Sequence, residues 1–288
     1  MESGNHGQHH EHHHHDFSET ETLGGAFFLN LTFTLIEIAG GLWTNSVAII
    51  ADALHDAGDS LALGLAWYLQ KASGKERDQQ FSYGYGRLSL LAALINGMVL
   101  LVGSFVIIMH VIPRFFTSQA VDATGMVGFS LLGIAFNGLA FWRNRSSQSL
   151  NAKMVNWHLL EDVLGWTIVL IGSIIMHFGD YSWLDPLMAL GVTLFILWNV
   201  SKSLGRVIKI FLQSNPEDVD LLAIEEELRL LKNVEDIHDV HAWSLDGKYH
   251  VLSLHVVINH IIDSETLALL KNQIREHTRK MGIDHCHH

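Results

Sequence analysis

The chain contains 288 residues, of which 18 are Lys or Arg, 30 are Asp or Glu and 20 are His, so its formal net charge is −12. This acidic balance excludes nucleic acid as the main partner, because phosphate binding needs clustered basic side chains. The single cysteine, Cys286, excludes an intrachain disulfide and any metal site built from several thiolates. A hydrophobic content of 49% with only three prolines excludes a chain that remains unfolded.

Charged residues are distributed unevenly along the chain. Residues 214–288 carry 14 acidic and 7 basic residues, whereas the first 213 residues carry only 27 charged residues in all. Two uncharged runs, Leu88–Ile112 and Ala123–Trp142, are long enough to cross a bilayer, which takes about 20 apolar residues. The sequence therefore predicts a membrane domain over residues 22–213 and a cytosolic domain over residues 214–288.

Four further apolar stretches complete a predicted set of six transmembrane helices. The first lies in Thr22–Ile50, which is apolar apart from Glu37 and is divided by the turn residues Trp43–Ser46. The others are Ala51–Gln70, Met154–His177 and Leu184–Leu204. Lys and Arg concentrate in the loops that follow the second, fourth and sixth spans, and this bias predicts that both termini face the cytosol.

Residues 1–21 precede the predicted spans and contain seven histidines in a polar setting. They lack the apolar core of a cleaved signal peptide, so we expect a native, disordered tail. The histidines among residues 6–15 either hold metal weakly or are only solvated.

The second predicted span carries four ionisable residues, Asp52, His55, Asp56 and Asp59. Their spacing of i, i+3, i+4 and i+7 places them on one narrow stripe of a helix. Such groups are costly inside a membrane and indicate a functional site.

The fifth predicted span repeats this chemistry with His158, Glu161 and Asp162. Each of the two spans thus contains a His-x-x-x-Asp pair, which brings an imidazole and a carboxylate together on one helix face. Two such pairs that face each other give a tetrahedral nitrogen and oxygen set that suits Zn²⁺. Imidazole also suits Co²⁺, Ni²⁺ and Cd²⁺, whereas Cu⁺ is disfavoured because the spans contain no cysteine.

Other interpretations of these residues remain open at this point. Salt bridges between helices are disfavoured because no Lys or Arg lies inside a span to pair with the acids. A proton relay without metal is the stronger competitor. Asp52 and Asp56 also form an i, i+4 pair, so the stripe alone does not fix which residues bind the ion. Glu37 is either a second polar lining residue or a lone hydrogen-bonded acid.

Several motifs across the chain resemble those of the cation diffusion facilitator family of zinc transporters. They are Ala51–Asp59, Phe81–Arg87, Asn96-Gly97, His158–Asp162, Asp185-Pro186 and Val240–Leu245. The resemblance implies that His55, Asp59, His158 and Asp162 bind the transported ion, with Asp52, Asp56 and Glu161 as acids near its path. The histidine in the second span is similar to the zinc-type branch of the family.

The same resemblance implies a homodimer in which each chain has six spans and a ferredoxin-like cytosolic domain. It also implies that the protein exchanges metal ions for protons across the lipid bilayer. Some family members bind metal in the loop after the second span, but Ala72–Gln80 contains no His, so Glu76 and Asp78 are expected only to solvate this loop. The absence of His from Arg143–Lys153 and the short chain favour a bacterial inner-membrane protein over a eukaryotic vesicular one.

The residues after Pro216 have the pattern of a small α+β domain. A helix is predicted over about 217–232, with Pro216 and the acids that follow it at its start. Two strands, Ile237–Leu245 and Tyr249–Ile258, flank the two-residue turn Asp246-Gly247. A second helix is predicted over Ser264–Met281, which leaves a short or missing last strand and hence an αββα order.

A two-residue turn in this hairpin places His238 directly opposite His255, and Trp243 opposite His250. His241 is then expected on the other face of the sheet. His238, His255 and the tail residues His285 and His287 form a candidate second metal site, and the family resemblance implies regulatory zinc in this domain. The competing interpretation is a set of ordinary surface histidines.

The sequence as a whole predicts a homodimeric exporter that exchanges cytosolic Zn²⁺ for H⁺ by alternating access, and not an enzyme. One alternative is an intramembrane metal-dependent hydrolase with Glu161 as its general base, although the chain contains no second hydrolytic motif. Another is a metal-sensing membrane scaffold.

Overall fold

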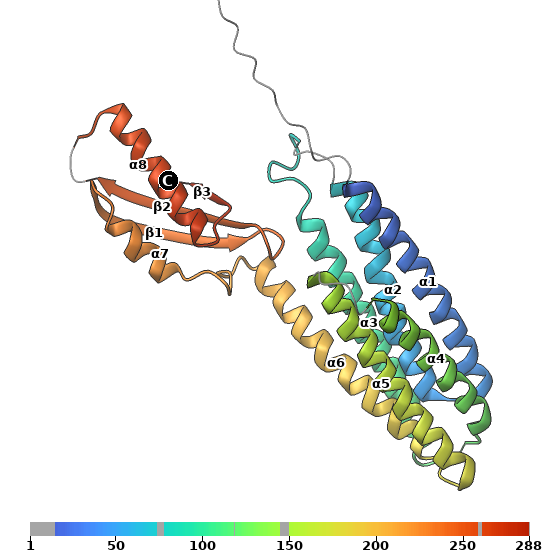
Figure 1. Cartoon of the computed structure of the whole chain (residues 1–288). Helices are drawn as coiled ribbons and strands as arrows, with labels where there is room; N and C mark the ends of the chain where they lie inside the picture. The colour runs from blue at the N-terminus through green and yellow to red at the C-terminus, as the bar shows by residue number, and fades with distance from the viewer. Residues whose placement is uncertain (1–14, 74–77, 118, 145–149, 259–260, 288) are drawn as a thin grey trace, which may run out of the picture. The chain divides into compact units, whose positions relative to one another are not determined.

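The computed structural model describes residues 15–73, 78–117, 119–144, 150–258 and 261–287. Six long helices are followed by a helix, two strands, a helix and a third strand (Figure 1). The chain forms two compact units, one made of residues up to 74 with 95–202, the other of residues 75–94 with 203–288. This arrangement confirms the predicted fold class of six helices followed by a small α+β domain.

The six long helices are α1 (His15–Thr44), α2 (Val47–Ser73), α3 (Arg87–Arg114), α4 (Ala123–Asn144), α5 (Leu150–Phe178) and α6 (Leu184–Phe211). Five of them are long and apolar enough to cross a membrane. The exception is α2, which carries the predicted stripe of Asp and His. Its turn from α1 lies where the sequence predicts it, and Asn45 adopts a positive φ of 55° there.

Helix α1 begins at His15, within the segment that was expected to be a disordered tail. The rest of that tail, including most of its histidines, lies outside the described residues. The expectation of disorder is therefore wrong for residues 15–21 and stays a prediction for the preceding ones.

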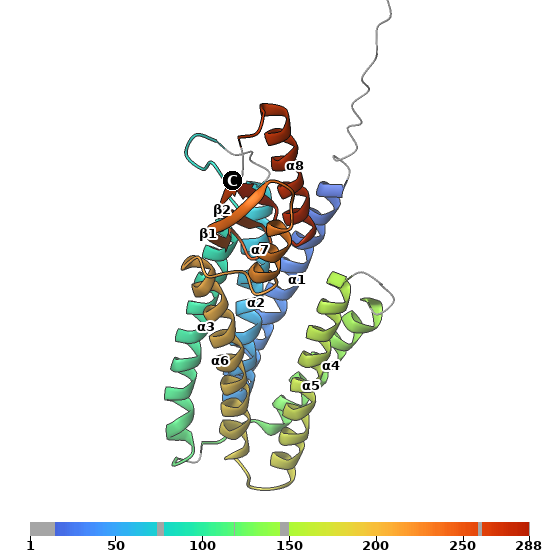
Figure 2. The same ribbon diagram turned by 90° about the vertical axis from the view of Figure 1, so that its left-hand side faces the viewer.

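The helices of the first unit pack in two main pairs, α1 with α2 and α4 with α5 (Figure 2). Contacts of α1 with α4 and of α2 with α5 join the pairs. One buried cluster joins all four helices through Phe33, Ile49, Met126, Trp166 and Val169. Outward-facing side chains are apolar as well, as in Phe105, Leu139 and Trp198, which are all more than half exposed. An apolar exterior of this kind is suited to lipid.

Asp185, at the start of α6, holds the beginning of α2 in place. Its buried carboxylate accepts hydrogen bonds from the backbone N–H of Val47 and Ala48, at 2.9 and 3.2 Å, and from the Ser46 hydroxyl. Helix starts leave such N–H groups without partners inside the helix. Arg114 of α3 lies 3.8 Å from the same carboxylate and donates to Asn45. Three helices are thereby joined at one end of α2.

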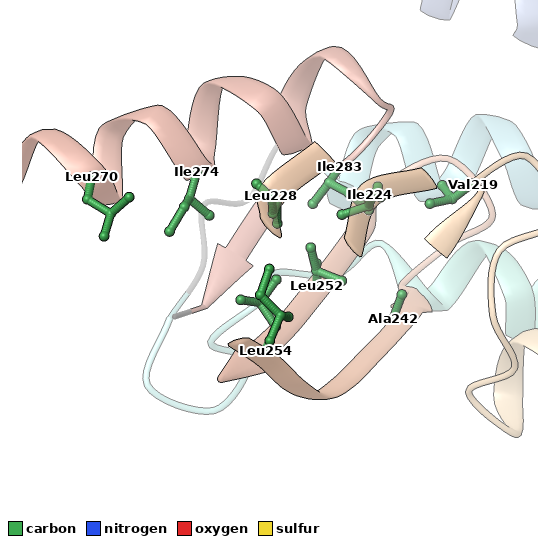
Figure 3. Packing of buried hydrophobic residues seen from close by; sticks show 10 residues of the cluster. Val219, Ile224, Leu228, Ala242, Leu252, Leu254, Leu270, Ile274 and Ile283 are labelled. Carbon is green, nitrogen blue, oxygen red and sulfur yellow. The ribbon is translucent and has the colours of Figure 1, made fainter. Parts of the chain in front are cut away.

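The second unit contains α7 (Leu221–Arg229), β1 (Val234–Ser244), β2 (His250–Ile258), α8 (Ser264–Lys280) and β3 (His285–His287). The sheet order is β1-β2-β3, with β1 and β2 antiparallel and β3 parallel to β2. Both helices direct apolar side chains toward the strands (Figure 3). The short last strand that the sequence left uncertain is therefore present, three residues long.

The predicted start of the first cytosolic helix is wrong. Helix α7 begins at Leu221 and not near 217, because Asp220 has extended backbone and its carboxylate accepts from the Ala223 N–H, as an N-cap residue does. Pro216 lies in the preceding turn and does not occupy the first helical position.

The hairpin between β1 and β2 differs from the predicted one in two ways that cancel. Leu245 donates to the Tyr249 carbonyl, so three residues lie between the last bonded pair and not two. An irregularity between His238 and His241 then inserts one extra residue into β1, with Asp239 at a positive φ of 56°. This is a β-bulge, in which two residues oppose one. Beyond it, His238 pairs with His255 as predicted.

Candidate metal site

Three predicted ligand residues from α2 and α5 converge in the membrane unit. One ligand atom from each of His55, Asp59 and His158 lies within 4.8 Å of the others. Asp59 Oδ2 is 2.9 Å from His158 Nε2 and 3.8 Å from His55 Nε2. The two imidazole rings are 5.6 Å apart between centroids. The packing of α2 against α5 thus joins residues separated by about a hundred positions in the sequence.

The separations fit a small tetrahedral ion. Zinc bonds of about 2.1 Å place tetrahedral ligand atoms about 3.4 Å apart. The distances of 2.9 and 3.8 Å lie on either side of this value. Within the described part of the chain, the buried oxygen Asp59 Oδ2 has no well-oriented hydrogen-bond donor, although His158 Nε2 is close. A buried acceptor without a donor is suited to a cation.

Asp162, the fourth predicted ligand, lies beside this group. Its Oδ2 is 3.8 Å from His158 Nε2, one helical turn along α5, and its side chain is 11% exposed. The structure therefore brings three of the four predicted ligands into one group and places the fourth next to one of them. The group remains accessible, because the side chains of His158 and His55 are 39% and 23% exposed.

The other acids predicted near the path of the ion lie in different surroundings. Asp56 is buried on the side of α1, where its backbone carbonyl accepts from Asn30. Asp52 lies toward α5, with Oδ1 4.0 Å from the position that a Cβ on Gly165 would take. Glu161 is exposed and is not among the three grouped residues. An exposed position removes the basis for Glu161 as the shielded base of a hydrolase.

Gly133 in α4 allows close packing against Trp166, which lies one helical turn after Asp162 in α5. A Cβ at this position would lie 2.3 Å from the ring of Trp166. Trp166 is 1% exposed and is one of the largest buried side chains. The missing side chain of Gly133 therefore lets Trp166 pack against α4 and hold α5 in place.

The cytosolic unit brings together histidines that the sequence assigned to a second site. His238 and His255 are opposite each other, with ring centroids 5.4 Å apart. His285 and His287 lie on β3 with ring centroids 4.4 Å apart, and His287 pairs with Ser253, two residues before His255. These histidines do not satisfy the distance that groups His55, Asp59 and His158, so the structure leaves the second site as a prediction.

His241 corrects the sequence analysis. The prediction placed it on the face opposite His238, but the bulge at Asp239 adds one residue and returns it to the exposed face. The turn, which is one residue longer than predicted, pairs Trp243 with Val251 and not with His250. The predicted face and the predicted Trp243 pair are therefore both wrong.

Asp239 is a candidate residue that the sequence analysis missed. It lies between two imidazoles, with Oδ1 2.8 Å from His241 Nε2 and Oδ2 3.6 Å from His255 Nδ1. The hydrogen bond with His241 holds the pKa of the Asp239 carboxyl below its usual value. The run His-Asp-Val-His contained these residues, but no periodic pattern marks a bulge in advance.

The loop between α2 and α3 is organised by Asp78. Its Oδ1 accepts from the backbone N–H of Gln80 and Phe81, and its Oδ2 accepts from the Tyr85 hydroxyl at 2.6 Å. The sequence analysis expected Asp78 only to solvate this loop, which understates its role. Glu76 lies outside the described residues.

Comparison with known proteins identifies the family. A model of the cation efflux transmembrane domain matches residues 25–211, and a model of the cation efflux protein cytoplasmic domain matches residues 216–286. The two matches together cover both units.

Curated relatives are similar over most of their length. One is a "Cadmium, cobalt and zinc/H(+)-K(+) antiporter" of Bacillus subtilis, 31% identical over 90% of this chain and 85% of the relative. Another is the "Metal cation efflux system protein CzcD" of Cupriavidus metallidurans, 30% identical over 90% and 83%. The "Zinc transporter ZitB" of Yersinia pseudotuberculosis is 28% identical over 91% and 87%. These matches confirm the resemblance drawn from the motifs, and the chain belongs to the cation efflux family of membrane transporters, the cation diffusion facilitators.

Proposed function

We propose that this protein exports Zn²⁺ from the cytosol in exchange for H⁺, with His55, Asp59, His158 and Asp162 as the ligands of the transported ion. The observation that carries the proposal is the convergence of His55, Asp59 and His158 from two helices of an apolar domain. The names of relatives include zinc, cadmium, cobalt and H⁺, so Cd²⁺ and Co²⁺ are further candidate cargoes, and imidazole chemistry adds Ni²⁺.

Exchange for protons follows from the chemistry of the ligands. Imidazole and carboxylate bind a metal ion only when the ligand atom is deprotonated. A proton that arrives from the far side of the membrane therefore displaces Zn²⁺, and loss of that proton to the cytosol restores affinity. Alternating access exposes the same atoms to each side in turn.

We further propose that residues 22–213 form the membrane domain and residues 214–288 a cytosolic regulatory domain of a homodimer. The positive-inside bias supports cytosolic termini, and bacterial relatives support the bacterial inner membrane as its location. His238, His255, His285 and His287 would bind regulatory Zn²⁺. The excess of acids in this domain supports a role for cations in bringing two copies together.

Flux into proteoliposomes tests the transport assignment. Asp59→Ala should abolish Zn²⁺ flux, because two imidazoles without their shared carboxylate hold the ion poorly. His110→Ala is the matched control, since His110 lies exposed on α3 and its ring is hydrogen-bonded to the Val106 carbonyl of its own helix. Its flux should equal that of the wild type. Wild-type flux from a folded Asp59→Ala protein would refute the ligand assignment.

A further inference from the structure

Glu37 is a buried acid in the membrane unit that the proposed metal site does not use. It lies in α1, and 1% of its surface is exposed. Among the described residues, neither carboxylate oxygen has a hydrogen-bond partner. A buried carboxylate without a donor pays its full desolvation cost. The Glu37 carboxylate therefore requires a hydrogen-bond donor or a proton that the described side chains around it do not supply.

The same face of α1 is otherwise well satisfied. Asn30 donates to the Asp56 carbonyl and to the Ser60 hydroxyl, each at 3.0 Å. Thr34, one turn further along, donates to the Asn30 carbonyl and lies 3.4 Å from the Ser60 hydroxyl. Glu37 continues this face by one more turn. The contrast shows that the α1–α2 contact satisfies its neutral polar groups and leaves the acid unsatisfied.

Among the described residues, the charged groups that act on Glu37 are acids. They are Asp52 and Asp56 of α2 and Asp162 of α5. Helix α4, which also contacts α1, is uncharged from Ala123 to Trp142. Ionised carboxylates only accept hydrogen bonds, so these neighbouring acids do not stabilise an ionised Glu37.

A metal ion explains this site less well than a proton does. Among the described residues, the group with three ligand atoms within 4.8 Å is His55, Asp59 and His158, and Glu37 with its neighbouring acids does not form another. A proton needs only one oxygen, which the Glu37 carboxylate supplies.

We propose that Glu37 binds an exchanged proton, at a site separate from the ligands of the transported metal. This inference rests on the proposed exchange of Zn²⁺ for H⁺. One carboxyl on α1 then carries a proton, while His55, Asp59 and His158 carry the ion between α2 and α5. The proton on Glu37 removes the buried charge in one conformation, and its release follows when the site opens to water.

The test is the H⁺ to Zn²⁺ ratio of the full-length protein in proteoliposomes with the membrane potential clamped at zero. Each exchanged proton multiplies the equilibrium Zn²⁺ ratio by about tenfold per unit of pH difference. Glu37→Gln, which is neutral and of the same shape, should lower that equilibrium ratio by about tenfold per pH unit relative to the wild type. It should retain Zn²⁺–Zn²⁺ exchange without a pH gradient. Glu226→Gln, an exposed change on α7, is the matched control and should leave the ratio unchanged.

Two outcomes separate this inference from the proposed function. If wild-type Zn²⁺ flux is not driven by a pH gradient, the proposed exchange itself is wrong. If the wild type is coupled and Glu37→Gln keeps the same ratio, only the proton assignment of Glu37 is overturned. Should Glu37→Gln fail to fold, Glu37→Asp decides the matter. It should keep the ratio but shift the pH at which exchange is half-maximal, and an unchanged pH profile would overturn the inference.

Discussion

The membrane unit and the cytosolic unit each place one carboxylate between two imidazoles, but they build this arrangement in different ways. In the membrane unit Asp59 lies between His55 and His158, which come from two separate helices. In the cytosolic unit Asp239 lies between His241 and His255 on one hairpin. The first group depends on helix packing and the second on strand register.

Their surroundings differ as much as their construction. The side chains of His241, His255 and Asp239 are all more than half exposed, so water can replace any contact that is lost. Asp59 Oδ2 is buried in a unit whose exterior is apolar. Electrostatic interactions between the same residue types are therefore strong in the membrane unit and weak in the cytosolic unit.

Removal of proposed ligands from one unit or from the other should give the largest difference. Asp162→Ala should reduce Zn²⁺ flux to background, because it removes one of the four proposed ligands and the remaining three hold the ion poorly. The double change His238→Ala and His255→Ala should preserve the maximal rate and alter only the Zn²⁺ concentration at which flux is half-maximal. Flux assays in proteoliposomes over a range of Zn²⁺ concentrations measure both. Complete loss of transport in a folded, dimeric double variant would contradict a regulatory role for the cytosolic unit.

Metal preference should depend on the membrane group alone. His55→Asp exchanges an imidazole nitrogen for a carboxylate oxygen and should shift preference toward Mn²⁺ or Cd²⁺. Competition flux assays with mixed metals report the ranking. His238→Asp is the matched change in the cytosolic unit and should leave the ranking as it is. An unchanged ranking in His55→Asp would show that His55 is not a ligand.

Truncation of apolar side chains within the cytosolic unit should have an effect that depends on whether the side chain faces the core or the solvent. Leu252 is fully buried under the helices of the cytosolic unit, so Leu252→Ala should destabilise this unit by about 2–5 kcal/mol. Leu222→Ala, 73% exposed on α7, should change stability by less than about 0.5 kcal/mol. Hydrogen exchange of residues 214–288 in the full-length protein measures both. Equal exchange in the two variants would be inconsistent with the described core.

The smallest effect concerns the start of α8. Hydrogen bonds from Thr266 hold the pKa of Asp263 below its usual value. The stability that this cap contributes is therefore present above the pKa of the unfolded chain and is lost as pH falls through the lower folded value. Protection of the first turn of α8 should decrease on acidification in the wild type, after correction for the intrinsic exchange rate. Asp263→Asn keeps a capping oxygen without the ionisation and should show less of this decrease. An identical pH dependence in the two proteins would contradict the ionised cap.

The sequence predicted the membrane helices well because their signal is compositional. Apolar runs and the turn at Trp43–Ser46 suffice to locate them, and the His-x-x-x-Asp spacing fixes which residues share a face. The role of Glu37 was left open for a physical reason. A single acid in an apolar helix implies a free-energy cost of burying its carboxylate. Only the packed structure shows whether a hydrogen-bond donor offsets that cost.

Prediction was weaker where one residue changes the geometry. The pairing of His238 with His255 was predicted correctly through two errors that cancel, a turn one residue longer than expected and a bulge at Asp239. The assignment of His241 to the opposite face failed because only one of these features lies between it and His238. Helix α7 began late because the Asp220 cap competes with Pro216 as a starting point.

The bulge at Asp239 also determines where this strand tolerates a change of length. Asp239 and Val240 together oppose Leu254, so an in-frame loss of codon 239 would leave Val240 opposite Leu254 and keep His238 and His241 on their present face. The loss of a codon from the regularly paired segment Ala242–Ser244 would instead shift every later residue to the other face. Relatives with a strand one residue shorter should therefore align with their gap at residue 239. In evolutionary terms, the bulge is an inserted residue that the hairpin has absorbed.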